Sequence, residues 1–374
     1  MVLALPQLKS ISQLNIISQK RSTEIKINLI HQKMNSLTCS RIKLLLFVLV
    51  YVFTFQFSSL HAQNKKEIQS ALNEAYEKYK DLEEGKNADY IEELASVDPN
   101  IFGIALVSAD GKLYSVGDIS TMVSIQSVSK VFTMAQVIEE QGHKAIQDKI
   151  GVDATGEVFN SIVAIERMQG KEINPMVNPG AIAATSLISG VDSAAKWNKI
   201  KEVQSAFAGR SLHLNIPVYI SEAEDNLRNQ AIAHLLLAYG RMYFDPVQTT
   251  DIYTKQCALN VNAKDLATMA GTLANGGVNP ISKEKVVSPE TVMYTLPVMA
   301  TAGLYDDSGI WYYNSGIPAK SGVGGGLLAV CPGKFGIAVV SPPLDPAGNS
   351  VKAQLVIKYV IDKLGVNPFL IDPK

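Results

Sequence analysis

Strand-like segments lie near both ends of this 374-residue chain, on either side of a long block with helical periodicity. The strand-like runs are 102–107, 112–116, 319–323, 327–331 and 335–340. Asp110-Gly111 between the first two runs favours a hairpin turn. Residues 127–295 are rich in Ala, Leu and Met at helical spacing. We therefore predict an α+β fold, with one antiparallel sheet formed from both ends of the mature chain, flanking helices and an inserted all-helical lobe.

Two amphipathic segments are expected to form the flanking helices. Residues 63–82 are polar with apolar positions at helical spacing, and residues 351–364 repeat this pattern before Gly365, which is typical of a helix end. No low-complexity linker divides the chain after residue 62. The predicted boundaries are 1–62 for an N-terminal extension with its signal, 63–374 for the folded domain, about 127–300 for the helical lobe, and about 63–126 with 301–374 for the sheet lobe.

An apolar run of 14 residues at 44–57 follows Arg41 and Lys43 and precedes a zone of short side chains that ends at Ala62. This order is typical of a secretory signal peptide cleaved after Ala62. A retained membrane anchor is the alternative, but the run is shorter than the ~20 residues that span a bilayer. We expect export to the periplasm or the medium, with no stable membrane anchor after cleavage.

Charge is distributed unevenly along the chain. Residues 1–62 hold seven basic residues and one acidic residue, which leaves 27 basic and 34 acidic residues and a net charge of −7 for the remainder. Such an acidic domain is unlike a general nucleic-acid binder. Translation starting at Met34 would still give a complete signal peptide, so Met1 and Met34 both stay open as the start.

The sequence contains no pattern typical of a metal or nucleotide site. His143, His213 and His234 are isolated, and neither a GxxxxGK[ST] motif nor a GxSxG nucleophile elbow occurs. Cys257 and Cys331 show no spacing typical of a disulfide framework and are expected to be free and buried. We predict an enzyme or binding protein without a metal or cofactor.

Ser127 and Lys130 form an SxxK motif at the start of a predicted helix. Residues three apart on a helix share one face, so the hydroxyl and the amine can meet. Burial would lower the lysine pKa and allow its neutral form to act as a base. The helix N-terminus also presents N–H groups to a developing oxyanion.

The SxxK motif alone is weak, because it recurs at Ser40-Lys43 and at Ser193-Lys196. Its weight comes from Lys320-Ser321-Gly322 on a predicted strand near the other end of the chain. SxxK opening a helix and K[ST]G on a late strand, in that order, resemble the outer motifs of the serine β-lactamase and penicillin-binding superfamily.

Several longer motifs narrow the resemblance. They are SIQSVSK at 124–130, NPMVNPGAI at 174–182, SE with a following RN at 221–229, YTKQC at 253–257 and GIPAKSGVGGG at 316–326. Together they resemble the serine-dependent glutaminase family, over about residues 88–349. The chain departs from the family pattern at Pro179, in the EDNLRNQA segment and in TAGLYD, and it carries an export signal.

This resemblance implies hydrolysis of L-glutamine to L-glutamate and ammonia through a glutamyl-enzyme ester. Ser127 would be the nucleophile and Lys130 its base. Tyr253 would assist proton transfer and contact the substrate, and Tyr305 would also approach the reacting amide. The backbone N–H groups of Ser127 and Val323 would form the oxyanion hole. By the same resemblance, the substrate-binding residues are Ser127, Asn178, Glu222, Asn229, Tyr253, Tyr305 and Val323, with Tyr90 at the rim. The resemblance also implies a homodimer or homotetramer.

Some of these residues have a purely structural interpretation as well. Asn178 precedes Pro179 and a helical run, so it could be a helix N-cap. Ser221 and Glu224 form a capping-box pattern, which predicts that a helix starts there and places Glu222 and Asn229 on one stripe almost two turns apart. Glu222 would then equally be an acid that favours the helix dipole.

Two other functions remain open at this stage. A β-lactamase or transpeptidase would share the SxxK and KSG motifs, although no SDN or YxN triplet occurs at a convincing middle position. A non-catalytic binding protein of the cell envelope could keep the fold, but the intact Ser127, Lys130 and Lys320 argue against it.

Overall fold

Strands from the two ends of the folded chain meet in one antiparallel sheet with the order β2-β1-β7-β6-β5. The strands are β1 (Gly103–Ser108), β2 (Leu113–Gly117), β5 (Ala319–Ser321), β6 (Gly326–Cys331) and β7 (Phe335–Val340). β1 lies directly beside β7, with Gly103 opposite Val340 and Ser108 opposite Phe335. The predicted α+β architecture is confirmed, and each predicted strand is found within two residues of its expected bounds.

The computed structural model describes residues 66–171 and 173–371. Glu67–Lys374 form one compact unit. The predicted signal segment at 1–62 lies outside the described residues. Within the described part of the chain, no helix combines the length and the hydropathy needed to cross a membrane.

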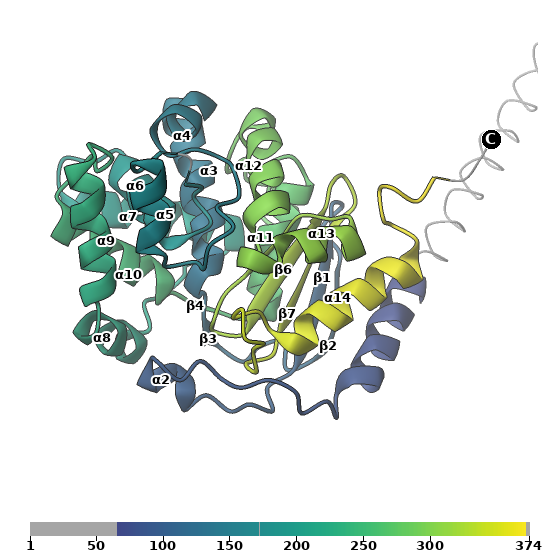
Figure 1. The fold of residues 1–374 in the computed structure, drawn as a ribbon. Coiled ribbons are helices and arrows are strands. Elements are labelled where there is room, and N and C mark those ends of the chain that lie inside the picture. The colour runs from purple at the N-terminus through teal and green to yellow at the C-terminus, as the bar shows by residue number, and fades with distance from the viewer. Residues whose placement is uncertain (1–65, 172, 372–374) are drawn as a thin grey trace, which may run out of the picture. The chain divides into compact units, whose positions relative to one another are not determined.

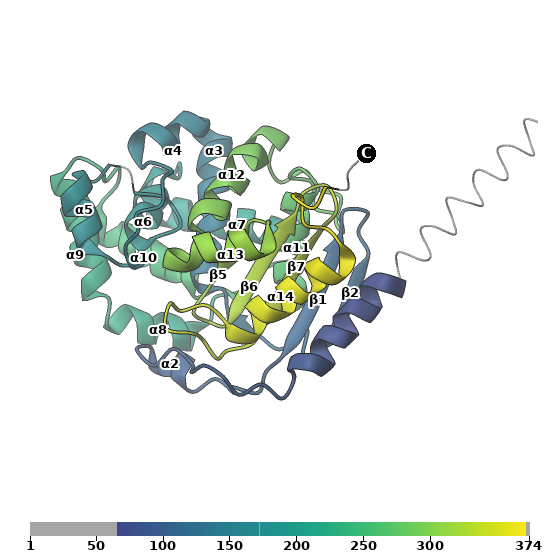
Figure 2. The same cartoon turned by 45° about the vertical axis from the view of Figure 1, so that its right-hand side comes forward.

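Helices cover both faces of the sheet (Figures 1 and 2). α11 (Ala263–Ala274) packs on one face, where it shares a core with strand side chains such as Val107. α14 (Val351–Leu364) and the helix at 66–79 pack on the other face, in a core that includes Ile104. Alternate residues of each strand therefore enter opposite cores, as the period of a β-strand requires.

Two glycines allow α11 to approach the sheet closely. A Cβ atom on Gly336 of β7 would lie 2.1 Å from the backbone nitrogen of Gly271 in α11. No side chain could be accommodated at that separation. The backbone of α11 therefore lies directly against β7, the middle strand of the sheet.

A helical lobe occupies the middle of the chain (Figure 1). Its helices are α3 (Ser129–Gln141), α4 (His143–Lys149), α5 (Ile162–Met168), α6 (Asn178–Leu187), α7 (Ser193–Ala208), α8 (Ile216–Glu224), α9 (Leu227–Ala238), α10 (Pro246–Cys257) and α12 (Pro289–Ala302). α3 is buried from Ser129 to Ile138, so it forms the centre of this lobe. β3 (Val123–Ser124) precedes α3 and pairs with β4 (Asn260–Val261), which follows α10.

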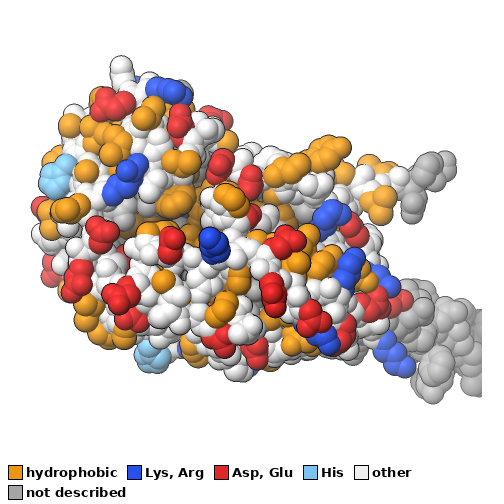
Figure 3. All heavy atoms as spheres, turned by 60° about the horizontal axis from the view of Figure 1, so that its bottom comes forward, with side chains coloured by type: hydrophobic (Ala, Val, Ile, Leu, Met, Phe, Trp, Pro, Cys, Tyr) orange, Lys and Arg blue, Asp and Glu red, His pale blue; other side chains and the backbone are white. Residues whose placement is uncertain are grey.

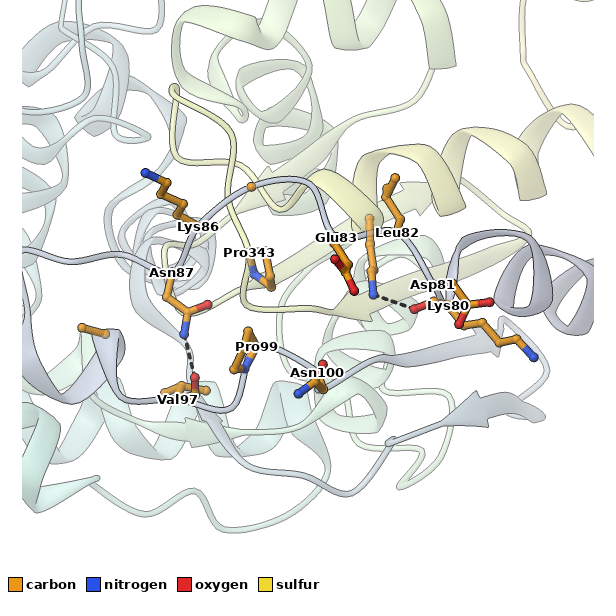
Figure 4. Close-up of a pocket in the computed structure, with 13 residues that line it drawn as sticks. Lys80, Asp81, Leu82, Glu83, Lys86, Asn87, Val97, Pro99, Asn100 and Pro343 are labelled. Carbon is orange, nitrogen blue, oxygen red and sulfur yellow. Dashed lines mark hydrogen bonds between the residues drawn. The ribbon is translucent and has the colours of Figure 1, made fainter.

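Residues 80–91 form an extended segment, here called the strap, which runs from the helix at 66–79 to α2 (Glu92–Ala95). Lys86 and Leu344 exchange two backbone hydrogen bonds of 3.0 and 2.8 Å, and Lys352 Nζ donates to the carbonyl of Lys80 at 2.9 Å. The strap borders a cavity of about 600 Å³. Figure 4 shows the residues that line it. These contacts fix the strap against α14 and the loop before it.

Candidate active site

The site begins at the tight turn that joins β3 to α3. This turn is the 3₁₀ helix η1 (Gln126–Val128), and Gln126 has a positive φ of 49°. Ser129 Oγ donates to the Gln126 carbonyl at 2.7 Å, which stabilises the strained backbone. Ser127 therefore lies at the start of α3, as predicted, and faces a cavity with only 7% of its surface exposed.

Lys130 follows Ser127 by three residues and is 1% exposed. Its Nζ donates to Asn178 Oδ1 at 2.7 Å and to the Met176 carbonyl at 3.4 Å. Burial lowers its pKa to about 8, and the negative charge of Glu222 opposes this shift only in part. A substantial fraction of Lys130 is neutral near pH 8, so this amine can accept a proton from a neighbouring hydroxyl.

Tyr305 lies between Ser127 and the KSG strand. It opens η2 (Tyr305–Asp307) with a positive φ of 57°, and its hydroxyl donates to the Ser321 carbonyl at 3.5 Å. Burial raises the Tyr305 pKa to about 12, and the nearby side chains of Ser127 and Ser321 oppose the shift. Tyr305 is thus a protonated phenol close to the serine hydroxyl.

Lys320 of the KSG motif is completely buried behind Tyr305. Its Nζ lies 4.0 Å from the centroid of the Tyr305 ring and donates to the Ser321 carbonyl at 2.7 Å. Burial lowers its pKa well below the ordinary value, and the nearby charge of Lys130 acts in the same direction. Lys320 therefore supports Tyr305 from outside the cavity.

The backbone N–H groups of Ser127 and Val323 are candidates to bind an oxyanion. Among the described residues, neither the Ser127 nor the Val323 N–H has a protein acceptor. The β5–β6 turn passes close to the nucleophile turn, since a Cβ atom on Gly322 would lie 3.3 Å from the Ser127 nitrogen and 2.8 Å from the Ile125 carbonyl. Unpaired N–H groups at this close approach can stabilise negative charge on a carbonyl oxygen.

Asn178 connects three of the predicted residues. Its Oδ1 accepts from Lys130 Nζ and, at 3.1 Å, from the Tyr253 hydroxyl, while its Nδ2 donates to Asn229 Oδ1 at 3.0 Å. The N-cap interpretation of Asn178 is wrong by one residue, because Val177 occupies that position and the Asn178 side chain does not cap the helix. Burial raises the pKa of Tyr253 well above its ordinary value, so this phenol also stays protonated.

Glu222 and Asn229 reach the cavity from different helices, which corrects the prediction of a single helix starting at Ser221. α8 already starts at Ile216, because Asn215 caps it through the Val218 N–H, and it ends at Glu224. α9 begins only at Leu227. The two side chains therefore line the cavity from either side of a break between helices and not from one stripe.

Burial raises the pKa of the Glu222 carboxyl to about 7. A hydrogen bond of 3.3 Å from Gln126 Nε2 and the charge of Lys130 oppose this shift. Glu222 can therefore titrate near neutral pH, and its ionised form is suited to binding an ammonium group.

These residues enclose a cavity of about 280 Å³, near the lower end of the range for small-molecule sites. It is lined by Tyr90, Ile91, Gln126, Ser127, Phe159, Asn160, Asn178, Ser221, Glu222, Asp225, Asn226, Arg228, Asn229, Tyr253, Cys257 and Val323. Seven of the nine predicted residues are in this lining. Of the other two, Lys130 hydrogen bonds the lining residue Asn178, and the Tyr305 ring packs against that of Phe159. Tyr90, 55% exposed at the end of the strap, lies at the rim as predicted.

Sequence reasoning assigned no role to several lining residues. Gln126 lies inside the SIQSVSK motif and could have been found there, whereas Phe159 and Asn160 come from a loop without a motif. Cys257 was expected to be structural, but it also lines the cavity. It is free and buried, as is Cys331, and burial raises its pKa to about 12.

No group of three or more His, Cys, Asp or Glu side chains in the described ranges could hold a metal ion. The chemistry available at the site is therefore that of a serine hydroxyl, a buried amine, two phenols, a carboxyl group and two backbone N–H groups. This set suits nucleophilic attack on a small amide or ester.

Comparison with known proteins agrees with this geometry. The family model described as Glutaminase matches residues 85–369. A glutaminase of Colwellia psychrerythraea is 51% identical over 81% of this chain and 97% of its own length, and glutaminase 2 of Yersinia pestis is 44% identical over 84% and 93%. The chain belongs to the glutaminase family. It is an amidohydrolase.

Solved structures of glutaminases share the fold as well as the sequence. The probable glutaminase ybaS matches with a TM-score of 0.81 and 45% identity, over 82% of this chain and 99% of that protein. A Bacillus glutaminase matches with a TM-score of 0.73 and 29% identity, over 80% and 99%. The glutaminase-family chain therefore has the β-lactamase-like fold that the SxxK and KSG motifs predict.

Proposed function

We propose that the protein hydrolyses L-glutamine to L-glutamate and ammonia through a glutamyl ester on Ser127, with Lys130 as the base. The observation that carries this proposal is a buried Lys130 that hydrogen bonds Asn178 at 2.7 Å and lies 5.9 Å from the centroid of the Tyr305 ring, next to Ser127 in a cavity of about 280 Å³. A related structure, 34% identical over 80% of this chain and 69% of that protein, is of Mglu in its glutamate form.

The first half of the reaction forms the ester. Neutral Lys130 accepts the Ser127 proton as Oγ attacks the side-chain amide carbon, and the N–H groups of Ser127 and Val323 stabilise the oxyanion. When the C–N bond breaks, ammonia leaves with a proton delivered from the Lys130 ammonium, for which the Tyr305 phenol is a relay.

The second half hydrolyses the ester. Water attacks the same carbonyl carbon, and its proton passes to Lys130 as the second oxyanion forms at the same two N–H groups. Collapse of this intermediate breaks the bond to Ser127 Oγ, which recovers its proton. No cofactor or metal is needed at any step.

Ammonia release from glutamine and asparagine, measured with purified protein, tests this function. We expect turnover of glutamine and a loss of about 10⁴-fold or more in kcat for Ser127→Ala. Ser193→Ala is the matched control, because Ser193 begins another SxxK sequence of the described chain, on α7 outside the cavity. Equal activity of Ser127→Ala and wild type, or no release from glutamine, would overturn the proposal.

A β-lactamase or penicillin-binding activity is the alternative function. No contact in the cavity favours it over the glutaminase reaction. Turnover of nitrocefin, or labelling of Ser127 by a fluorescent penicillin, would support it.

We also propose that the protein is exported and that its signal is cleaved after Ala62. The basic residues Arg41 and Lys43, the apolar run at 44–57 and the short side chains after it support this. N-terminal sequencing of the protein from fractionated cells should give a chain that starts at Gln63 in the periplasm or the medium.

A homodimer or homotetramer is the proposed assembly. Apolar side chains that stay exposed on α8 and α9 support it, since Ile216, Ile220 and Leu227 are 52%, 48% and 72% exposed. Light scattering coupled to size-exclusion chromatography would give the mass of the assembly.

A further inference from the structure

The backbone carbonyl of Ser321 is a shared acceptor behind the catalytic cavity. It accepts from Lys320 Nζ at 2.7 Å and from the Tyr305 hydroxyl at 3.5 Å. Both donors are buried, so a shift of this one carbonyl would move the groups that surround the phenol. A residue that holds Ser321 in place therefore affects where the Tyr305 hydroxyl lies.

Asn349, two residues before α14, holds the side chain of Ser321. The Ser321 hydroxyl donates to Asn349 Oδ1 at 2.6 Å, and both residues are completely buried. Asn349 is not among the residues that line the catalytic cavity. It does not cap α14 either, because the Ser350 side chain accepts the hydrogen bond from the Ala353 N–H.

Asn349 also reaches the turn that carries Tyr305. Its Nδ2 donates to Asp307 Oδ2 through a long hydrogen bond of 3.5 Å, and Asp307 ends η2, whose first residue is Tyr305 with its positive φ. In the part of the chain that the structure describes, the Asp307 carboxylate has no other hydrogen-bond donor. One asparagine thus contacts both the strand that accepts from the phenol and the strained turn that carries it.

Asn349 donates to two carboxylates that repel each other. Its backbone N–H donates to Asp345 Oδ1 at 2.9 Å, and its amide donates to Asp307. Burial raises the pKa of Asp307, and the negative charge of Asp345 acts in the same direction. Acidic side chains are also spread over the face turned forward in Figure 3. The N–H groups of Asn349 therefore offset part of the repulsion that would open the turn at Tyr305.

We propose that Asn349 is a positioning residue for the Tyr305 phenol, which it holds by fixing the Ser321 carbonyl and the η2 turn relative to each other. This inference rests on the proposed glutaminase function, in which the phenol relays a proton to the departing ammonia. A displaced phenol would slow this transfer. Substrate binding would change little, because Asn349 lies outside the cavity lining.

Substitution of Asn349 should lower kcat without raising KM. For Asn349→Ala we expect kcat for glutamine to fall about 30-fold with KM within about twofold of the wild type. Asn349→Asp combined with Asp307→Asn exchanges the two side chains. This swap keeps an acceptor for the Ser321 hydroxyl, an amide–carboxylate pair and the same total charge, so kcat should return to within about threefold of the wild type.

A double-mutant cycle with Tyr305→Phe tests whether Asn349 acts through the phenol. Tyr305→Phe removes the hydroxyl and keeps the ring. In this background Asn349→Ala should lower kcat by no more than about twofold, because no hydroxyl remains to be positioned. If Asn349→Ala does not fold, Ser321→Ala removes only the hydroxyl that Asn349 holds, and the same dependence on the Tyr305 hydroxyl is expected.

Asn279→Ala is the matched control. Asn279 is also completely buried, and its Nδ2 donates to the carbonyls of Ala206 and Phe207 at 2.9 and 3.1 Å, but it does not line the cavity. Its substitution should lower the melting temperature and leave kcat for glutamine unchanged. Thermal melting of each variant shows whether it is folded under assay conditions.

Three results would overturn the role of Asn349. An equal fall in kcat with and without the Tyr305 hydroxyl would show that Asn349 only stabilises the fold. Wild-type kcat in Asn349→Ala, or a swap variant no more active than Asn349→Ala, would show that its contacts do not position the phenol. Failure of the glutaminase function itself gives a different result, because the wild-type protein would then release no ammonia from glutamine.

Discussion

The two ends of the cavity are built in opposite ways. At the end that carries the chemistry, Ser127, Lys130, Tyr305 and Lys320 are all at most 7% exposed. At the end that would recognise the amino acid, Arg228 is exposed and Tyr90 is 55% exposed. Burial shifts the pKa of the lysines at the first end, whereas exposed charge at the second stays available to attract a charged substrate.

Substitution at the buried end should have the largest effect. Lys130→Met removes the proposed base, so we expect kcat/KM for glutamine to fall about 10³-fold. In the wild type, kcat/KM should rise as the pH increases through about 8, because the pKa of Lys130 is lowered to about 8 and only the neutral amine accepts a proton. Ammonia release measured from pH 6 to 10 tests both points.

Lys196→Met provides the control for that substitution. Lys196 is another buried lysine of an SxxK sequence, 5% exposed, and lies outside the cavity. Its loss should leave the position of the pH profile unchanged. If Lys130→Met kept the wild-type activity and the same rise near pH 8, the buried end would not supply the base.

An intermediate effect is expected where the two ends meet, at Glu222. Its pKa is raised to about 7, so the carboxylate becomes protonated as the pH falls through 7 and loses its attraction for an ammonium group. KM for glutamine should therefore increase below pH 7. Glu222→Gln should raise KM by about 10- to 100-fold at pH 8 and remove most of this pH dependence.

Glutaramate, which is glutamine without its amino group, serves as the control substrate. Its KM should not respond to Glu222→Gln in the way that the KM of glutamine does. An equal increase in both KM values would mean that Glu222 has a structural role. Glu222 would then not belong to the part of the cavity that recognises the amino acid.

The smallest effect is expected at the exposed rim. Tyr90→Ala removes an aromatic ring that is more than half exposed, so KM for glutamine should change by only about two- to fivefold with kcat nearly constant. Tyr313→Ala, at a position 85% exposed and outside the cavity, should change neither constant. A large fall in kcat for Tyr90→Ala would show that the rim takes part in the chemistry.

Sequence reasoning succeeded best at the buried end. The spacing of Ser127 and Lys130 fixes both residues within one helical turn. Lys320 and Ser321 lie on β5, inside the strand-like run predicted at 319–323, so local rules place both motifs correctly. Tyr305 was found only through the family resemblance, because its position depends on a strained turn with positive φ that no pattern marks.

The recognition end was harder to predict, since competing local signals surround it. Ser221 and Glu224 have the spacing of a capping box. However, Asn215 caps the helix six residues earlier, and this helix ends at Glu224. Two overlapping start signals cannot be ranked without the tertiary contacts that select one. The short strands β3 and β4, with two residues each, are below the length at which alternation can be recognised.

The neighbouring position of β1 and β7 in the sheet has a consequence for how the molecule folds. Gly103 pairs with Val340, so the central strand contact closes a loop that contains the whole helical lobe. Contacts of such high sequence separation slow folding, and β1 has no partner on that edge until the last part of the chain is available. A chain cut short before Phe335 should therefore expose an apolar strand edge and aggregate.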